Sequence, residues 1–170
     1  MMILTITACS AAEHHAPNTD TVALLRTVVK YASDTLKVGP KIVIARTAKA
    51  NPGVRMSLET QNALVSSDPA LSSVERYDIA HQVCDTVAKA PAFCHFADVD
   101  GMIAVRDVQL WRDSARVAIE YYRTSPAGGG DAKATGKKVL VYNAGNASVA
   151  RDVNGRWKVK KFTETGSTKP

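Results

Sequence analysis

The chain of 170 residues carries a formal net charge of +6, and its composition is 45% hydrophobic and 22% charged. A chain of this length fits one globular domain with a short tail, and the composition excludes a collagen-like, repetitive or wholly disordered protein. No apolar run approaches the roughly 20 residues of a membrane-spanning helix. The net positive charge favours an anionic partner; the alternative is that it only keeps the protein soluble.

The first residues form a short apolar run that ends in Ile6-Thr7-Ala8-Cys9. This tetrapeptide resembles the lipobox of bacterial lipoproteins, and the resemblance implies that the thiol of Cys9 receives a diacylglyceryl group. A complete signal peptide needs a basic start and roughly 7–15 apolar residues, so residues 1–8 are expected to be the remnant of a longer signal. Residues 9–18 are small, polar and interrupted by proline, which is typical of a flexible tether.

The same resemblance implies a location. A lipid on Cys9 would hold the protein to the periplasmic side of a bacterial membrane, and Ser10 after the cysteine favours the outer membrane. The alternative is an apolar N-terminus with a chance cysteine, which leaves the periplasm or the cytoplasm. The adjacent His14 and His15 have no scaffold to fix coordination geometry, so no metal is predicted.

A single α+β domain is predicted over residues 19–163, and it begins with helices. The first starts at an N-cap at Asn18 or Asp20 and ends before Gly39-Pro40. A β segment follows at 41–45, and a short helix is predicted at 57–65. Ser72-Ser73-Val74-Glu75 fits a capping box, which predicts a third helix. The apolar stripe of that helix is formed by Ile79, Val83 and Val87.

The chain has three cysteines, and an odd number in an exported protein leaves one to explain. If Cys9 is lipidated, Cys84 and Cys94 remain as a pair, with Pro91 turning the chain between them. We expect them to form a disulfide, which requires an oxidising compartment. Two buried free thiols are the alternative.

The second half predicts antiparallel strands. Residues 103–111 and 117–121 form a hairpin around Arg112-Asp113-Ser114, and a further strand is predicted over 138–149. Asn154-Gly155 predicts a type I′ turn before the last strand. Residues 164–170 are expected to be a polar tail.

Helices followed by strands predict an α+β fold, with N-terminal helices packed on a curved antiparallel β-sheet of about four strands. The last strand contains Gly155-Arg156-Trp157-Lys158-Val159. This motif, within residues 102–162, resembles the late hairpin of the cystatin-like and nuclear-transport-factor-2-like superfamily. The resemblance implies a sheet that cups a ligand or active site beneath the helices, but it transfers no catalytic residue.

Several titratable residues are candidates for proton transfer. Tyr77 and His81 stand one helical turn apart, so they could converge at a pocket or lie on an exposed helix face. The remaining candidates are His95, Asp98, Asp100 and Asp107. The spacing around Asp98-Val99-Asp100-Gly101 does not fit a calcium loop, because a phenylalanine would occupy the first ligand position. No cofactor is predicted.

The last strand also carries a basic face, since Arg156, Lys158 and Lys160 alternate with Trp157 and Val159, and further cations are expected nearby, namely Lys137, Lys138, Arg151 and Lys161. These side chains could protect a sheet edge from pairing, or bind an anionic envelope polymer or lipid headgroups. Nucleic acid is not expected, because the strands lack the interleaved aromatic residues of a stacking platform.

Three functions remain open. The first is a lipid-anchored cell-envelope protein that acts as a non-catalytic binding or accessory module, with an envelope polymer or protein as partner. The second, implied by the superfamily resemblance, is a small-molecule-binding protein or an enzyme similar to the SnoaL and ketosteroid isomerase groups. The third is an inhibitor or immunity-type protein that uses an exposed loop or edge strand.

Overall fold

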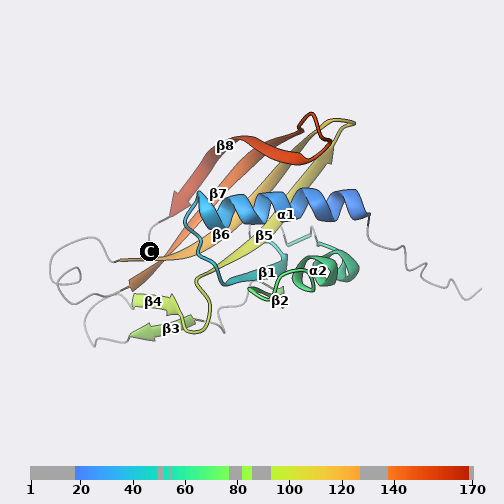
Figure 1. Ribbon diagram of the computed structural model, residues 1–170. Coiled ribbons are helices and arrows are strands. Elements are labelled where there is room, and N and C mark those ends of the chain that lie inside the picture. Colours follow the sequence, from blue (N-terminus) through green and yellow to red (C-terminus); the bar gives the residue numbers. More distant parts are fainter. Residues whose placement is uncertain are drawn as a thin grey trace, which may run out of the picture.

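The computed structural model describes residues 18–49, 52–53, 55–76, 82–85, 93–126 and 138–168 (Figure 1). Within these ranges the helices are α1 (Thr19–Asp34) and α2 (Leu58–Val65). The strands are β1 (Ile42–Thr47), β2 (Leu71–Arg76), β3 (Gln82–Asp85), β4 (Phe93–Phe96), β5 (Gly101–Leu110), β6 (Ser114–Pro126), β7 (Lys138–Arg151) and β8 (Trp157–Thr168). Among the described residues, no helix combines the length and the apolar character needed to cross a bilayer.

The first three predicted elements are confirmed. The side chain of Asn18 caps α1 by accepting a hydrogen bond from the backbone N–H of Asp20 at 3.0 Å. The hydroxyl of Ser57 caps α2 in the same way, by accepting from the N–H of Thr60 at 3.1 Å. Strand β1 lies between the two helices in sequence, and nearly all of it is buried.

The predicted third helix is wrong, because residues 71–76 form strand β2. This strand pairs in parallel with β1, and Leu71 lies opposite Ile42 in the register. Glu75, which would close the capping box, instead pairs with the guanidinium of Arg46. Of the expected apolar stripe, Val83 lies in β3 and is exposed, whereas residues 79 and 87 fall outside the described part. A long-range strand partner has therefore overridden the local helix signal.

The expected sheet of about four antiparallel strands under helices is also wrong. The structure has a mixed sheet of six strands in the order β2-β1-β5-β6-β7-β8. Strand β1 runs parallel to both of its neighbours, and β5 to β8 are joined by antiparallel pairings. This position explains why β1 is apolar along nearly its whole length, because a central strand with parallel neighbours is buried on both faces of the sheet.

Two apolar clusters cover the two faces of the sheet. The larger one joins α1 and α2 to residues such as Ile44, Ile103 and Tyr121. The smaller one lies on the opposite face and includes Phe96 of β4 and Met102 of β5. Strands β3 and β4 form a separate hairpin beside that face (Figure 1). Both helices therefore pack on one face, and of the described elements only β3 and β4 lie over the other.

The two late hairpins are confirmed in position but not in every detail. Strands β5 and β6 pair as predicted, with Leu110 opposite Ala115. The β7–β8 connection is not a type I′ turn, because among the described residues outside glycine only Lys37 has a positive φ. Instead, the N–H of Gly155 donates to the carbonyl of Asp152 at 2.9 Å, and Gly155 itself takes the left-handed conformation at φ 75°. Strand β8 continues through residues 164–168, which the sequence assigns to a polar tail.

Candidate functional site

The candidates for proton transfer do not form one site in the described part of the chain. Tyr77 and His81 lie outside the described residues, His95 is half-buried on β4, and Asp98 is exposed in the loop that follows. The carboxylate of Asp100 accepts from the backbone N–H of Lys41 at 2.8 Å, which ties the start of β5 to β1.

Asp107 is far from Asp100. The two positions are seven steps apart along an extended strand, a distance of roughly 20 Å. The carboxylate of Asp107 accepts from the side-chain amide of Gln109 at 2.9 Å. Each of these aspartates therefore has a local partner, and they cannot act as one acid–base pair.

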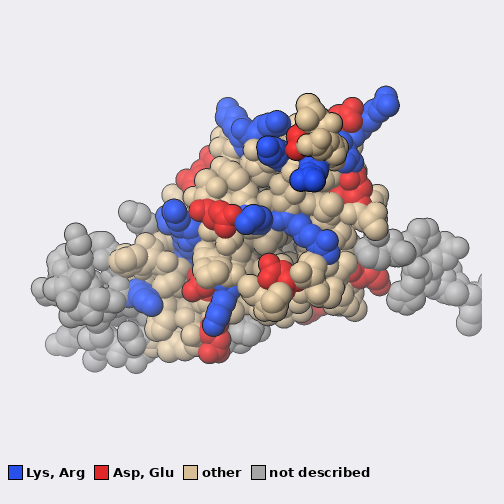
Figure 2. Space-filling model, viewed as in Figure 1, with Lys and Arg blue, Asp and Glu red and all other residues tan. Residues whose placement is uncertain are grey.

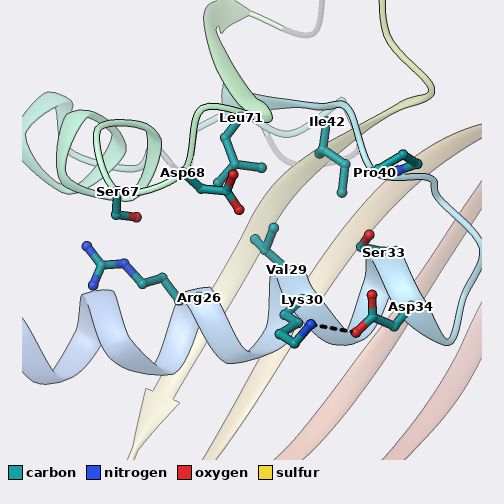
Figure 3. A pocket seen from close by; sticks show the side chains of 10 residues that line it. All are labelled: Arg26, Val29, Lys30, Ser33, Asp34, Pro40, Ile42, Ser67, Asp68 and Leu71. Carbon is teal, nitrogen blue, oxygen red and sulfur yellow. Dashed lines mark hydrogen bonds and ion pairs between the residues drawn. The ribbon is translucent and has the colours of Figure 1, made fainter.

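A cavity of about 280 Å³ lies between α1 and the first residues of β1 and β2, Ile42 and Leu71 (Figure 3). Figure 3 shows Lys30 and Asp34 pairing along α1, at a distance of 2.9 Å between Nζ and Oδ2, and Arg26 reaching toward Ser67. The hydrogen bond that Lys30 donates to the carboxylate of Asp34 raises the pKa of Lys30. Two cations and two carboxylates line this cavity, so its charges compensate one another.

A second cavity of about 360 Å³ lies beside the start of β5. It is lined by Lys37, Gly39, Asp100, Thr124, Ser125, Pro126 and Lys138. Of the predicted catalytic candidates that the structure describes, this cavity contains only Asp100, whose carboxylate accepts from the backbone N–H of Lys41. Within the described ranges, no group of three or more His, Cys, Asp or Glu side chains is placed to hold a metal ion.

The structure adds one titratable residue that the sequence analysis missed, the fully buried Glu120 of β6. Its carboxylate accepts from the backbone N–H of Lys49 at 2.8 Å and lies 3.7 Å from Nε of Arg106. Burial, with a further contribution from Glu120, raises the pKa of Tyr142. This carboxylate fixes the segment after β1 against the sheet, because a buried charge is stable only when it is paired and hydrogen-bonded. The burial of Glu120 could not be predicted from the sequence, because the alternation of apolar and polar residues along β6 predicts an exposed side chain at this position.

The disulfide partners lie opposite each other in the β3–β4 hairpin. Cys84 and Cys94 are paired in the strand register, and their sulfur atoms are 2.12 Å apart. Cys84 is exposed on β3, and not part of the predicted third helix. Cys94 packs against the smaller apolar cluster. The bond therefore closes the hairpin that lies beside the second face of the sheet, while Cys9 falls outside the described residues.

The most distinctive polar feature is on the sheet face opposite α1. Arg116 of β6 lies opposite Ser148 of β7, which in turn lies opposite Lys161 of β8. Two residues further along β7, Ala150 lies opposite Lys158. Because alternate residues of a strand share a face, all five side chains point to the same side of the sheet. Arg116, Lys158 and Lys161 are exposed, and we call them the basic sheet face.

The basic sheet face is compact and shallow. Neighbouring strands are about 4.8 Å apart, which places Arg116 and Lys161 about 10 Å from each other. The floor between them is built from short side chains, namely Ala118, Asn146, Ser148 and Ala150. Figure 2, which views the molecule from the α1 side, shows further lysine and arginine side chains along the β8 edge of the sheet and around the β7–β8 turn. The arrangement can hold an extended anion rather than enclose a small molecule.

The predicted basic residues of the last strand only partly coincide with this surface. Arg156, Lys158 and Lys160 are all exposed, opposite the buried Trp157. Lys160 falls at a bulge, because the register passes from Lys161 to Val159 between Ser148 and Val149. The bulge is what brings Lys161 onto the same face as Lys158.

No known protein-family model matches the chain, and no curated protein shows a significant match to it.

Proposed function

We propose that the protein is a non-catalytic binding module of the bacterial cell envelope, anchored by a lipid on Cys9, whose basic sheet face binds an anionic polysaccharide. The observation that carries the proposal is the row of exposed cations formed by Arg116, Lys158 and Lys161 over a floor of short side chains. The anchor rests on the likeness of Ile6-Thr7-Ala8-Cys9 to a lipobox.

The position of Arg116 separates binding from mere protection of a sheet edge. Lysines on β8 blunt an edge strand whether or not they bind anything. Arg116, however, lies on β6, which is paired with β5 on one side and β7 on the other. It therefore protects no edge, although it shares a face with the two lysines. A surface that extends inward from the edge over three strands is suited to a long, charged ligand.

The shape of this surface favours a polymer. An open face excludes little water, so each charge contributes modestly and the attraction is screened by salt. Affinity then depends on several cations acting on one chain of repeating negative charges. A small monoanion would gain too little from such a face to stay bound.

Binding to fluorescently labelled dextran sulfate, with neutral dextran as the reference, tests the proposal. The double variant Lys158→Gln with Lys161→Gln should weaken binding by at least about tenfold, which corresponds to about 1.4 kcal/mol. The matched control, Lys30→Gln with Lys41→Gln, removes the same charge from exposed positions away from this face and should change affinity less than about twofold. Equal losses in the two double variants would show that only net charge matters and would refute the assigned face.

The anchor needs a separate experiment. The gene is expressed in a Gram-negative host with its in-frame upstream sequence, and the wild type is compared with Cys9→Ala by detergent phase partition and intact mass. A detergent-soluble product with an acyl mass increment, lost in the variant, supports the anchor. If both proteins stay in the aqueous phase without that increment, the anchor is wrong, whatever the result for the basic sheet face.

A further inference from the structure

Exposed apolar side chains gather at one end of the sheet. Among the described residues, five large hydrophobic side chains are exposed, and three of them lie at the ends of two hairpins: Leu110 at the end of β5, Trp111 in the turn that follows it, and Val153 in the turn between β7 and β8. Val153 is fully exposed, and the exposed fraction of Trp111 is 54%. A group of exposed apolar side chains gathered in one place, unlike a single one, marks an interaction surface.

The two turns are neighbours in space. The backbone N–H of Arg151, at the end of β7, donates to the carbonyl of Asp113 in the β5–β6 turn at 3.0 Å. In the strand register, Ser114 at the start of β6 lies opposite Ala150. Leu110, Trp111 and Val153 therefore belong to one end of the sheet, which we call the hairpin tip.

The charges at the hairpin tip are mainly basic. Exposed Arg112 and Arg156 lie within the two turns themselves, and Arg116 and Lys158 follow on the adjoining strands. The acidic groups are Asp113, Asp152 and Asp20; the carboxylate of Asp152 accepts hydrogen bonds from the backbone N–H groups of Arg156 at 3.0 Å and Asn154 at 2.9 Å, and that of Asp20 pairs with Arg151. An apolar tip with a tryptophan and a surround of cations matches the chemistry of a membrane surface, where indole rings favour the interface and anionic headgroups attract arginine and lysine.

The N-terminus of α1 leaves the domain at this same end. Oδ1 of Asp20, in the first turn of α1, accepts from Arg151 Nη2 at 2.6 Å and from Trp157 Nε1 at 2.9 Å. Figure 1 shows the start of α1 on the side of the molecule to which the β7–β8 turn points. Nine peptide steps separate Cys9 from Asn18, so a lipid on Cys9 would keep the start of α1 within about 30 Å of the bilayer.

We propose that the hairpin tip is a membrane-docking surface, which inserts Leu110, Trp111 and Val153 into the interfacial region of a bilayer while Arg112 and Arg156 contact anionic headgroups. The contact holds the sheet upright on the membrane and leaves the basic sheet face open to the side. The docking goes beyond the proposed function and depends on the lipid anchor only for its orientation. A domain without the acyl chain should therefore still recognise anionic vesicles.

The test uses the full chain carrying Cys9→Ala, so that no acyl group contributes. It is mixed with vesicles of phosphatidylcholine containing about one third phosphatidylglycerol, and with vesicles of phosphatidylcholine alone. Trp157 is buried, so a change in tryptophan emission on binding reports mainly on Trp111. We expect co-sedimentation with the anionic vesicles and a blue shift of the emission. No binding to either vesicle, or no shift on binding, would overturn the proposal.

Single variants with a matched control test whether the hairpin tip makes the contact with the membrane. Trp111→Ser and Val153→Asp should each lower partition into anionic vesicles by at least about fivefold. Val83→Ser removes an apolar side chain of similar exposure from β3 and should leave partition unchanged. Equal losses in all three variants would refute the hairpin tip as the docking site. Dimers in sedimentation without vesicles, abolished by Trp111→Ser, would assign the tip to a second copy of the chain instead.

These outcomes are separable from those of the proposed function. Neutral dextran, dextran sulfate and vesicles are distinct probes, and neither Trp111 nor Val153 belongs to the basic sheet face. Loss of dextran sulfate binding with intact vesicle binding would refute the polysaccharide proposal and leave the docking surface standing. The opposite pattern would refute the docking surface alone.

Discussion

Replacing Trp157 by alanine should destabilise the protein by roughly 3–5 kcal/mol. The indole is only 6% exposed and belongs to the larger apolar cluster beneath α1. The guanidinium of Arg151 lies over the ring, 4.1 Å from its centroid, and Asp20 accepts the indole N–H. Truncation therefore leaves a cavity and removes the partner of a carboxylate at the same time. Urea unfolding followed by far-ultraviolet circular dichroism measures the free energy of unfolding.

A double-mutant cycle divides this loss into its parts. Trp157→Phe keeps most of the buried ring and loses the hydrogen bond to Asp20, so it should cost about 1–2 kcal/mol. Asp20→Ala should cost about the same, because its carboxylate is partly exposed and screened by solvent. The two changes should be non-additive by about 0.5–1 kcal/mol, since they remove one shared bond. A loss below about 1 kcal/mol for Trp157→Ala would refute the assignment of this ring to the core.

Two further predictions concern the buried side chain of Gln61 and the dependence of stability on pH through Asp152. Nε2 of Gln61 is 2.7 and 2.9 Å from carbonyl oxygens of β1 and β2, and the side chain is 2% exposed. Gln61→Leu should therefore lower the free energy of unfolding by about 2–3 kcal/mol, and an unchanged urea midpoint would show that the carbonyls do not need it. For Asp152, the hydrogen bond from the N–H of Arg156 holds its pKa below the ordinary value of 3.8. Its stabilisation is present above that pH and lost as the pH falls through the lower folded pKa, so Asp152→Asn should flatten the stability profile below pH 3.8. Parallel profiles for the variant and the wild type would contradict this.

The sequence predicted correctly those elements whose stabilising contacts lie within a few residues along the chain. The caps of α1 and α2 lie within three residues of the N–H groups they satisfy, so Asn18 and Ser57 were recognisable from sequence. The turn between β5 and β6 is equally local. Strand β2 was not recognisable, because its partner β1 lies about 30 residues earlier and pairs in parallel. A capping-box pattern carries no information about such a partner.

The candidate site divides in the same way. Alternation along β8 is enough to predict that Lys158 is exposed and Trp157 buried. The sequence also places Lys161 near this face, but the side to which it points depends on a bulge in β8, and the inclusion of Arg116 depends on the pairing of β6 with β7. Leu110, Trp111 and Val153 each read as ordinary turn or strand residues. Their common position appears only when the two hairpins are placed side by side.

The mixed sheet has a consequence for the order in which the chain assembles. Each antiparallel pairing between β5 and β8 is made by a neighbour in sequence, whereas β1 must meet β5 across 59 positions, as the bond between Lys41 and Asp100 illustrates. Closing that loop costs more entropy than closing a hairpin, and non-local pairings slow folding. We therefore expect the antiparallel strands β5 to β8 to pair first during folding, and β1, with β2 and both helices, to join them last.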